Sequence, residues 1–151
     1  MSIFPLHKIH GHLFIQVDGH LWLLDTGAPC SFGSPSDFHI LGEKFKLQSS
    51  YLGLTPETLS GFVGVKIDGL LGADVLNNFD IIFNCPENTS IFSLSILNLD
   101  GQVVKLDEIM GIPIVSATVN GRDYRMFFDT GAQISYFQDD ALRTFPPAGQ
   151  V

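Results

Sequence analysis

Short apolar runs separated by polar turns fill most of the 151-residue chain, and this pattern predicts β-strands. Residues 12–17 and 20–24 are two such runs, joined by Asp18-Gly19, a dipeptide that favours a tight hairpin turn. Residues 79–83 and 91–96 also have the apolar pattern of strands. We therefore expect an all-β fold.

The opening pattern returns later in the chain. Residues 114–119 and 124–128 are apolar runs on either side of Asn120-Gly121, a second hairpin signal. In both places the second strand leads into the same sequence, Asp-Thr-Gly-Ala, at residues 25–28 and 129–132. The matched order of strand, turn, strand and Asp-Thr-Gly-Ala is an internal repeat.

The two copies of the repeat lead into different sequences. The first is followed by Ile-Asp-Gly-Leu-Leu-Gly at residues 67–72 and by a candidate short helix at 73–77. Nineteen residues, 133 to 151, come after the second copy, and they hold one helical candidate at 138–144. We therefore predict a complete unit at residues 1–100 and the N-terminal part of a second, truncated unit at residues 101–151.

Three stretches between these landmarks give weaker patterns. Residues 31–60 are rich in turn residues, and we expect short strands with a mobile loop there. From Gly61 a strand interrupted by glycines is expected to lead into the Leu-Leu-Gly sequence. Asp100-Gly101 predicts a further hairpin.

The composition excludes several classes of protein. Apolar residues make up 45% of the chain and charged residues 16%, which excludes a disordered protein. The formal net charge of −8 argues against nucleic-acid binding, which needs a basic surface. The chain has no apolar run long enough to cross a membrane and no signal-peptide pattern, so we expect a cytoplasmic protein. Cys30 and Cys85 are then expected to be reduced, although one disulfide between them stays open.

Each repeat carries an aspartate from an apolar strand into a turn. Carboxylates are rarely left in apolar surroundings unless they are paired, hydrogen-bonded or shifted in pKa. If Asp25 and Asp129 meet, they share one proton and can activate a water molecule that attacks a carbonyl carbon. The turn residues expected to tighten and rigidify the two carboxylate loops are Thr26, Gly27, Thr130 and Gly131.

These residues carry a family resemblance. Asp25-Thr26-Gly27-Ala28 and Asp129-Thr130-Gly131-Ala132 resemble the catalytic motif of the aspartic peptidases, especially the retropepsin-like branch. Leu70, Leu71 and Gly72 resemble that family's hydrophobic-hydrophobic-Gly element, which supports the first aspartate through a ψ-shaped loop. The resemblance implies an all-β, acid-protease, closed β-barrel lobe plus the start of a second, incomplete lobe, with Asp25 and Asp129 as catalytic residues between them.

The resemblance implies an aspartic endopeptidase that acts on a peptide or protein substrate and needs neither a cofactor nor a metal. The alternative is a non-catalytic peptide-binding or dimerisation module built on the same lobe. The partner of Asp25 is also open: Asp129 of the same chain in a two-lobed molecule, or a residue of a second copy in a homodimer, with Asp129 as a possible decayed remnant.

Three further features enter as expectations. Tyr51 is a candidate for the aromatic residue of a flap over the site, with an ordinary core or surface tyrosine as the alternative. Ala28 and Ala132 stand where the pepsin-like branch usually has Ser or Thr, which predicts a less acid working pH. His10, His12 and His20 are expected on a solvated strand face rather than in a zinc site.

Overall fold

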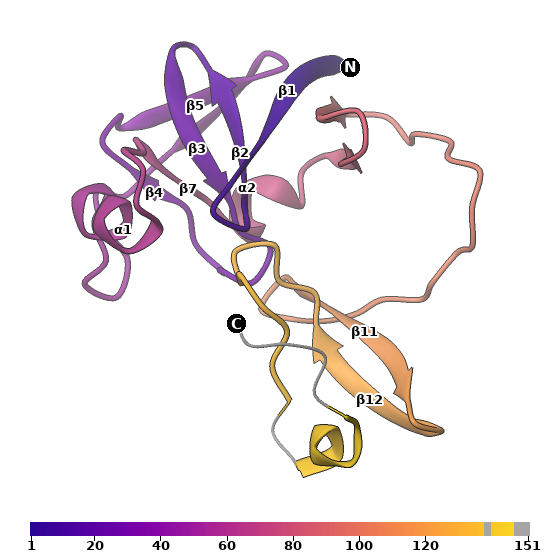
Figure 1. Ribbon diagram of the computed structural model, residues 1–151. Coiled ribbons are helices and arrows are strands. Elements are labelled where there is room, and N and C mark those ends of the chain that lie inside the picture. Colours follow the sequence, from indigo (N-terminus) through magenta and orange to yellow (C-terminus); the bar gives the residue numbers. More distant parts are fainter. Residues whose placement is uncertain (138–139, 147–151) are drawn as a thin grey trace.

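The computed structural model describes residues 1–137 and 140–146 (Figure 1). In these residues the largest element is a seven-stranded mixed sheet with the order β4-β7-β3-β2-β1-β9-β8. Neighbouring strands are antiparallel except β3 and β7, which are parallel. Its strands are β1 (Ser2–Ile9), β2 (His12–Val17), β3 (His20–Leu24), β4 (Phe32–Gly33), β7 (Gly69–Leu71), β8 (Asp80–Asn84) and β9 (Thr89–Ser93).

Smaller elements complete the described part of the chain. The strands β5 (Asp37–Ile40) and β6 (Glu43–Lys46) form a separate two-stranded hairpin, and two short helices are α1 (Pro56–Val63) and α2 (Ala73–Leu76). After a connecting segment at 94–106, a three-stranded sheet stands apart from the large one (Figure 1). It is made of β10 (Asp107–Ile109), β11 (Ile112–Val119) and β12 (Arg122–Phe127), and a 3-10 helix follows at Asp140–Thr144.

The mainly β character is confirmed, but the expected closed barrel is not found. Within the described residues, the two edges of the large sheet are β4 and β8, which are not paired with each other. Closure needs a continuous ladder of hydrogen-bonded neighbours around the sheet. The two-residue strand β4 continues only into a single bridge between Phe32 and Gln48, and β5 and β6 pair with each other instead. The sheet therefore stays open.

Both predicted Asx-Gly hairpins are confirmed. Asp18 and Gly19 have φ of 51° and 81°, and Asn120 and Gly121 have φ of 52° and 73°. A two-residue turn with positive φ at both positions matches the twist of the strands it joins, and Asx and Gly tolerate that conformation best. The turn at His10-Gly11, which joins β1 to β2 in the same conformation, gives a weaker sequence signal and was not predicted.

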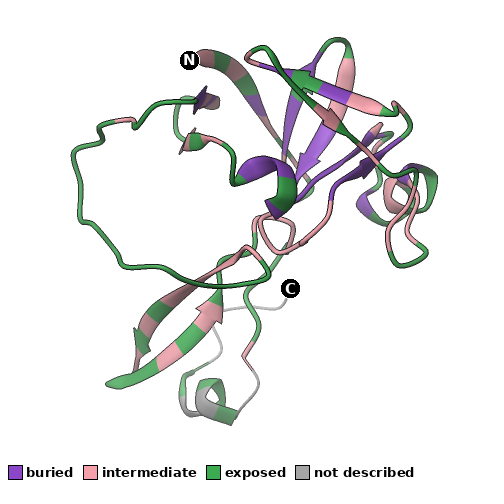
Figure 2. Ribbon diagram, turned by 180° about the vertical axis from the view of Figure 1, so that it is seen from behind, coloured by how far each residue is buried: buried purple, intermediate pink, exposed green. Residues whose placement is uncertain are grey.

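Apolar side chains cover both faces of the sheet around β3. Trp22 and Leu24 belong to one core cluster, which also holds Ile15 and Leu71, while Leu23 belongs to a second cluster on the other face. This alternation follows from the period of two along a strand. Buried residues lie in the part of the chain up to β9, and the described residues after it include no buried side chain (Figure 2). The core therefore belongs to the first unit.

Two expectations about the middle of the chain are wrong. Gly61 lies inside helix α1, because Thr55 caps the helix by accepting a 3.2 Å hydrogen bond from the Thr58 N–H, and Pro56 suits the first helical position. Asp100-Gly101 forms no hairpin, since β10 begins only at Asp107. Of the helices in the described ranges, none is long and apolar enough to span a bilayer.

Residues 138–139, which begin the helical candidate at 138–144, lie outside the described residues, and the rest of that candidate contains the 3-10 helix.

Replacing Leu71 by Ala should lower the free energy of unfolding by about 2 to 5 kcal/mol, because the side chain has 0% exposure in the middle of the core. Leu52→Ala is the matched control, since Leu52 is 85% exposed and should cost less than about 0.5 kcal/mol. Urea unfolding followed by the fluorescence of Trp22 measures both. Equal effects of the two substitutions would contradict the described core.

Candidate active site

The two Asp-Thr-Gly turns lie against each other at the ends of β3 and β12. A Cβ atom added to Gly27 would overlap the Asp129 carboxyl group, and one added to Gly131 would overlap the Asp25 carboxyl group. Neither glycine has a positive φ, so their backbone conformation does not require glycine. The site requires glycine at both positions because the absence of a side chain leaves room for the carboxyl group of the other turn.

A reciprocal set of four hydrogen bonds from Thr26 and Thr130 joins the two turns. The Thr26 hydroxyl donates to the Phe128 carbonyl at 2.5 Å and accepts from the Thr130 N–H at 3.0 Å. The Thr130 hydroxyl donates to the Leu24 carbonyl at 2.8 Å and accepts from the Thr26 N–H at 3.1 Å. Each hydroxyl acts as donor and acceptor, so the two turns are tied by a pseudo-twofold arrangement.

Asp25 is the electrostatically perturbed member of the pair. Burial, the charge of Asp129 and a hydrogen bond to Asp129 raise the pKa of Asp25 to about 7, against the opposing effect of the Gly27 and Ala28 N–H groups. The Gly27 N–H donates to Asp25 Oδ1 at 2.9 Å. A carboxyl group with this pKa holds a proton at mildly acid pH, which is the state that a general acid needs.

Asp129 is more exposed than Asp25. Its Oδ1 accepts hydrogen bonds from the N–H groups of Gly131 at 2.9 Å and Ala132 at 3.1 Å. Beside it lies a hollow of about 790 Å³, bordered mainly by aromatic and aliphatic side chains. The pair therefore combines one carboxyl group inside the first unit with one that faces open space.

The predicted Leu70-Leu71-Gly72 element lies directly behind Asp25. The Asp25 N–H donates to the Leu71 carbonyl at 3.0 Å, and β7 pairs in parallel with β3. The Ala73 N–H donates to the Ala28 carbonyl at 2.8 Å, and a side chain at Gly72 would collide with that carbonyl. The start of α2 therefore fixes the far end of the Asp25 turn.

Two polar residues that support this element were not assigned to the site from the sequence. Ser31 Oγ accepts from the Gly72 N–H at 2.8 Å and donates to Asp74 Oδ1 at 2.5 Å. Asp74, which the sequence suggests only as a helix cap or an ion-pair partner, also accepts from the Ser31 N–H at 2.9 Å. A serine next to a cysteine carries no sequence signal for such a bridge, and neither does an aspartate inside a short helix.

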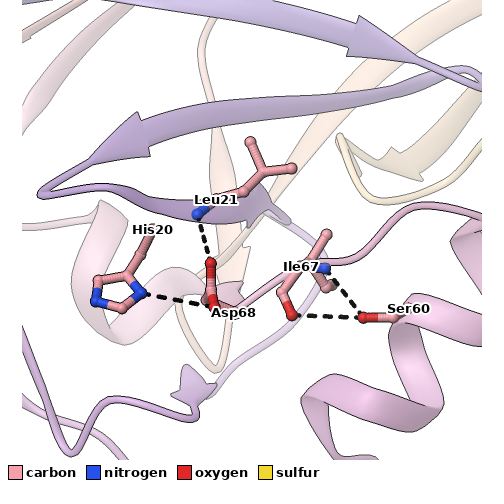
Figure 3. Close-up of polar contacts among 5 residues, drawn as sticks. All are labelled: His20, Leu21, Ser60, Ile67 and Asp68. Carbon is pink, nitrogen blue, oxygen red and sulfur yellow. Dashed lines mark hydrogen bonds and ion pairs between the residues drawn. The ribbon is translucent and has the colours of Figure 1, made fainter.

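Asp68 anchors the segment that leads into β7 (Figure 3). Its Oδ2 accepts from the Leu21 N–H at 2.9 Å, and its Oδ1 lies 3.5 Å from His20 Nδ1. One step earlier, Ser60 Oγ accepts from the Ile67 N–H at 3.0 Å. Side chains therefore hold this segment against β3 and α1 before the backbone pairing of β7 begins.

Side chains also connect the first unit to the second turn. His12 donates from Nδ1 to the Gly131 carbonyl at 3.0 Å, and Gln133 Nε2 donates to the His10 carbonyl at 2.8 Å. The sequence favoured a solvated strand face for these histidines, and that interpretation missed the contact. His12 and Gly131 are 119 residues apart, and no local pattern indicates such a pairing.

Tyr51 does not lie on an extended flap. It begins a tight turn in which Tyr51 and Leu54 exchange backbone hydrogen bonds of 3.0 and 2.9 Å, and its side chain packs against the core cluster that includes Leu23. Burial and the neighbouring Cys30 raise the pKa of the Tyr51 hydroxyl above its usual value. The structure thus gives Tyr51 a packing position, and Cys30 and Cys85 are both free thiols.

Comparison with models of protein families, with curated protein sequences and with solved structures found no match in any of the three.

Thr26→Val and Thr130→Val should each lower the free energy of unfolding by about 1 to 3 kcal/mol, because each removes a hydroxyl that bonds twice in the junction. The double variant should lose less than the sum, since both changes break the same network. Thr118→Val on the exposed hairpin should cost less than about 0.5 kcal/mol. Urea unfolding of the wild type, the two single variants and the double variant gives the coupling energy between the two threonines. Strict additivity would contradict the network.

Stability should fall as the pH rises from about 4 to 7, because folded Asp25 keeps a proton that the unfolded chain releases near pH 3.8. Asp25→Asn cannot lose this proton. It should therefore gain roughly 2 to 4 kcal/mol over the wild type between pH 4 and pH 8. Urea unfolding across this range measures the difference, with Asp100→Asn as an exposed control that should not show it. A gain that appears on acidification instead would reverse the sign and contradict the raised pKa.

Proposed function

We propose that the protein is an aspartic endopeptidase, in which Asp25 and Asp129 activate water for the hydrolysis of a peptide bond. The observation that carries the proposal is the meeting of two Asp-Thr-Gly turns, each with its glycine against the carboxyl group of the other. Aspartates with a purely structural role at strand ends do not need to lie side by side. Two adjacent carboxylates repel each other unless they share a proton, so their close approach supports a chemical role.

The chemistry follows from the unequal surroundings of the two carboxyl groups. Asp25, whose pKa is raised, holds the proton of the pair, which leaves the role of base to Asp129. A water molecule attacks the carbonyl carbon and gives up a proton to Asp129. At the same time Asp25 donates its proton to the carbonyl oxygen. Collapse of the tetrahedral diol breaks the C–N bond, with a proton passing to the leaving nitrogen. No covalent enzyme intermediate forms.

The surroundings of the pair support a peptide substrate. Phe127 and Phe128, which precede Asp129, are exposed and line the hollow, and this favours apolar side chains in the subsites. The arrangement of β2, β3, β7 and the Asp25 turn also supports the retropepsin-like acid-protease lobe as the finer description of the first unit. In this proposal both aspartates belong to one chain, and the reaction uses no cofactor.

A non-catalytic peptide-binding module is the second candidate. The observation in its favour is the open second unit, where Asp129 is exposed beside a large hollow. Water that exchanges freely with solvent around one carboxylate weakens the electrostatic stabilisation that catalysis needs. The two candidates differ in one respect that an experiment reaches directly, since only the peptidase needs a carboxyl group at both positions.

Asp25→Asn and Asp129→Asn should each lower the cleavage rate of an unfolded protein by a factor of about 10² to 10⁴, because each removes one partner of the acid–base pair. Asp100→Asn, an exposed residue of the connecting segment, is the matched control and should keep the wild-type rate. Mass spectrometry of the peptides released at pH 5 to 6 measures the rate.

The pH profile gives the same experiment a second readout. Cleavage should decrease above about pH 7 as Asp25 loses its proton. The absence of a hydroxyl at Ala28 and Ala132 predicts an optimum that is not below about pH 3. Equal cleavage by wild type and Asp25→Asn, or none by either, would favour the binding module.

A further inference from the structure

The turn between β1 and β2 lies against the second Asp-Thr-Gly turn. Gln133 Nε2 donates to the His10 carbonyl at 2.8 Å, and a Cβ atom added to Gly11 would lie 2.7 Å from Gln133 Cγ. Directly after this turn, His12 begins β2, and its Nδ1 lies 3.0 Å from the Gly131 carbonyl oxygen. Two hydrogen bonds that involve side chains therefore connect the start of β2 to the second turn.

The β1–β2 turn is itself fixed to the first unit. His10 Nδ1 donates to the Val63 carbonyl at the end of α1 at 2.9 Å, and a Cβ atom added to Gly64 would lie 3.2 Å from the same Nδ1. Two residues after His12, Phe14 is fully buried, and the two rings lie edge to face with their centres 6.5 Å apart. Because its own backbone is held in this way, His12 can hold the second turn in place.

The hydrogen bond from His12 to the second turn has one possible direction. A carbonyl oxygen only accepts, so Nδ1 carries the proton when the ring is neutral. The protonated ring also carries a proton on Nδ1, so the bond is kept in both charge states of the imidazole. An aromatic ring without nitrogen cannot make this bond.

The Gly131 carbonyl belongs to the same peptide group as the Ala132 N–H, which donates to Asp129 Oδ1 at 3.1 Å. Because a peptide group is planar, a bond that fixes the direction of its C=O also fixes the direction of its N–H. A hydrogen bond to the C=O also polarises the group and strengthens its N–H as a donor. His12 therefore acts on the Asp129 carboxyl group through one peptide group.

The same contact affects the distance between Gly131 and Asp25. A Cβ atom added to Gly131 would lie 2.3 Å from Asp25 Cγ, so the backbone of this glycine lies close to that carboxyl group. A displacement of the Gly131 carbonyl would therefore change the approach of the two carboxyl groups, as well as the hydrogen bond that Asp129 accepts.

The first turn is held by backbone groups of its own unit. The Ala28 carbonyl accepts from the Ala73 N–H at 2.8 Å, where α2 begins. Any residue except proline can supply a backbone N–H, whereas the bond to the Gly131 carbonyl needs a side-chain donor at position 12. The second turn therefore depends on the identity of one side chain of the first unit.

We propose that His12 is a positioning residue for Asp129. Its bond to the Gly131 carbonyl directs the Ala132 N–H toward Asp129 Oδ1 and keeps the two carboxyl groups close enough to share a proton. The effect on catalysis rests on the proposed function, whereas the effect on the geometry of the turn does not. Because His12 acts through the turn in this role, its loss should change kcat more than KM.

His12→Phe keeps a ring beside Phe14 and removes the donor. This variant should lower kcat for the cleavage of fluorescein-labelled casein by about 10- to 100-fold and change KM by less than about twofold, because it disturbs the orientation of the acid–base pair. His12→Asn keeps an N–H donor near the position of Nδ1 and should restore kcat to within about threefold of the wild type.

Asn77→Ala is the matched control. Asn77 Nδ2 donates to the Gly111 carbonyl at 2.8 Å, so this variant also removes a side-chain hydrogen bond to the second unit, but in the turn between β10 and β11. It should keep the wild-type kcat. An equal loss of kcat in Asn77→Ala and His12→Phe would show that only the docking of the units matters, and would overturn the proposal.

Hydrogen exchange of the Ala132 amide, followed by NMR on the isotopically labelled chain, gives a readout that needs no cleavage. Exchange should be about three- to tenfold faster in His12→Phe than in the wild type, because the bond to Asp129 is loosened. In His12→Asn and Asn77→Ala it should stay within about twofold of the wild type. Unchanged exchange in His12→Phe would overturn the proposal.

The tautomer of His12 in the wild-type chain gives an answer even if His12→Phe does not fold. The nitrogen chemical shifts of the neutral ring should place the proton on Nδ1, and a proton on Nε2 would overturn the proposal.

The two kinds of readout separate this proposal from the peptidase proposal. Faster exchange at Ala132 in His12→Phe, without cleavage by the wild type, would support the positioning role and contradict the peptidase. Full cleavage by His12→Phe would overturn the positioning role and leave the peptidase in place.

Discussion

The close approach of two carboxyl groups is the constraint on which the rest of the site depends. Each group occupies the space that a side chain at Gly27 or Gly131 would fill, so the two turns can meet only if both positions lack a Cβ. Two ionised carboxylates at this separation repel each other, and one shared proton removes most of that cost. The threonine hydrogen bonds then hold the turns in a position that the carboxylates alone would oppose.

The two halves of this junction are not built alike. The Asp25 turn has backbone partners on β7 and α2, both inside a packed core. The Asp129 turn has its own hairpin, the threonine bonds and the side chain of His12. Burial is therefore uneven, and it raises the pKa of Asp25. Two turns of the same sequence therefore have unequal surroundings, because the fold around them is asymmetric.

The sequence was informative where local chemistry decides the structure. Asx-Gly turns with positive φ identified both hairpins, and the period of two assigned Trp22 and Leu23 to opposite faces of β3. It failed where distant partners decide. Gly61 suggested an interrupted strand, yet Thr55 and Pro56 begin a helix across it. The contact of His12 with Gly131 depends on the tertiary arrangement and has no local signature.

The repeat also explains why the second unit does not reproduce the first. It covers a hairpin and an Asp-Thr-Gly-Ala turn, but the core cluster beside the Asp25 turn also takes Phe32, Val63 and Leu70 from outside the repeat. A hairpin without such partners cannot bury its apolar face, and small sheets need that burial for stability. The described residues of β10, β11 and β12 accordingly contain no buried side chain. The second aspartate is thus positioned by contacts with the first unit, while apolar side chains of its hairpin such as Phe127 stay exposed in the described residues.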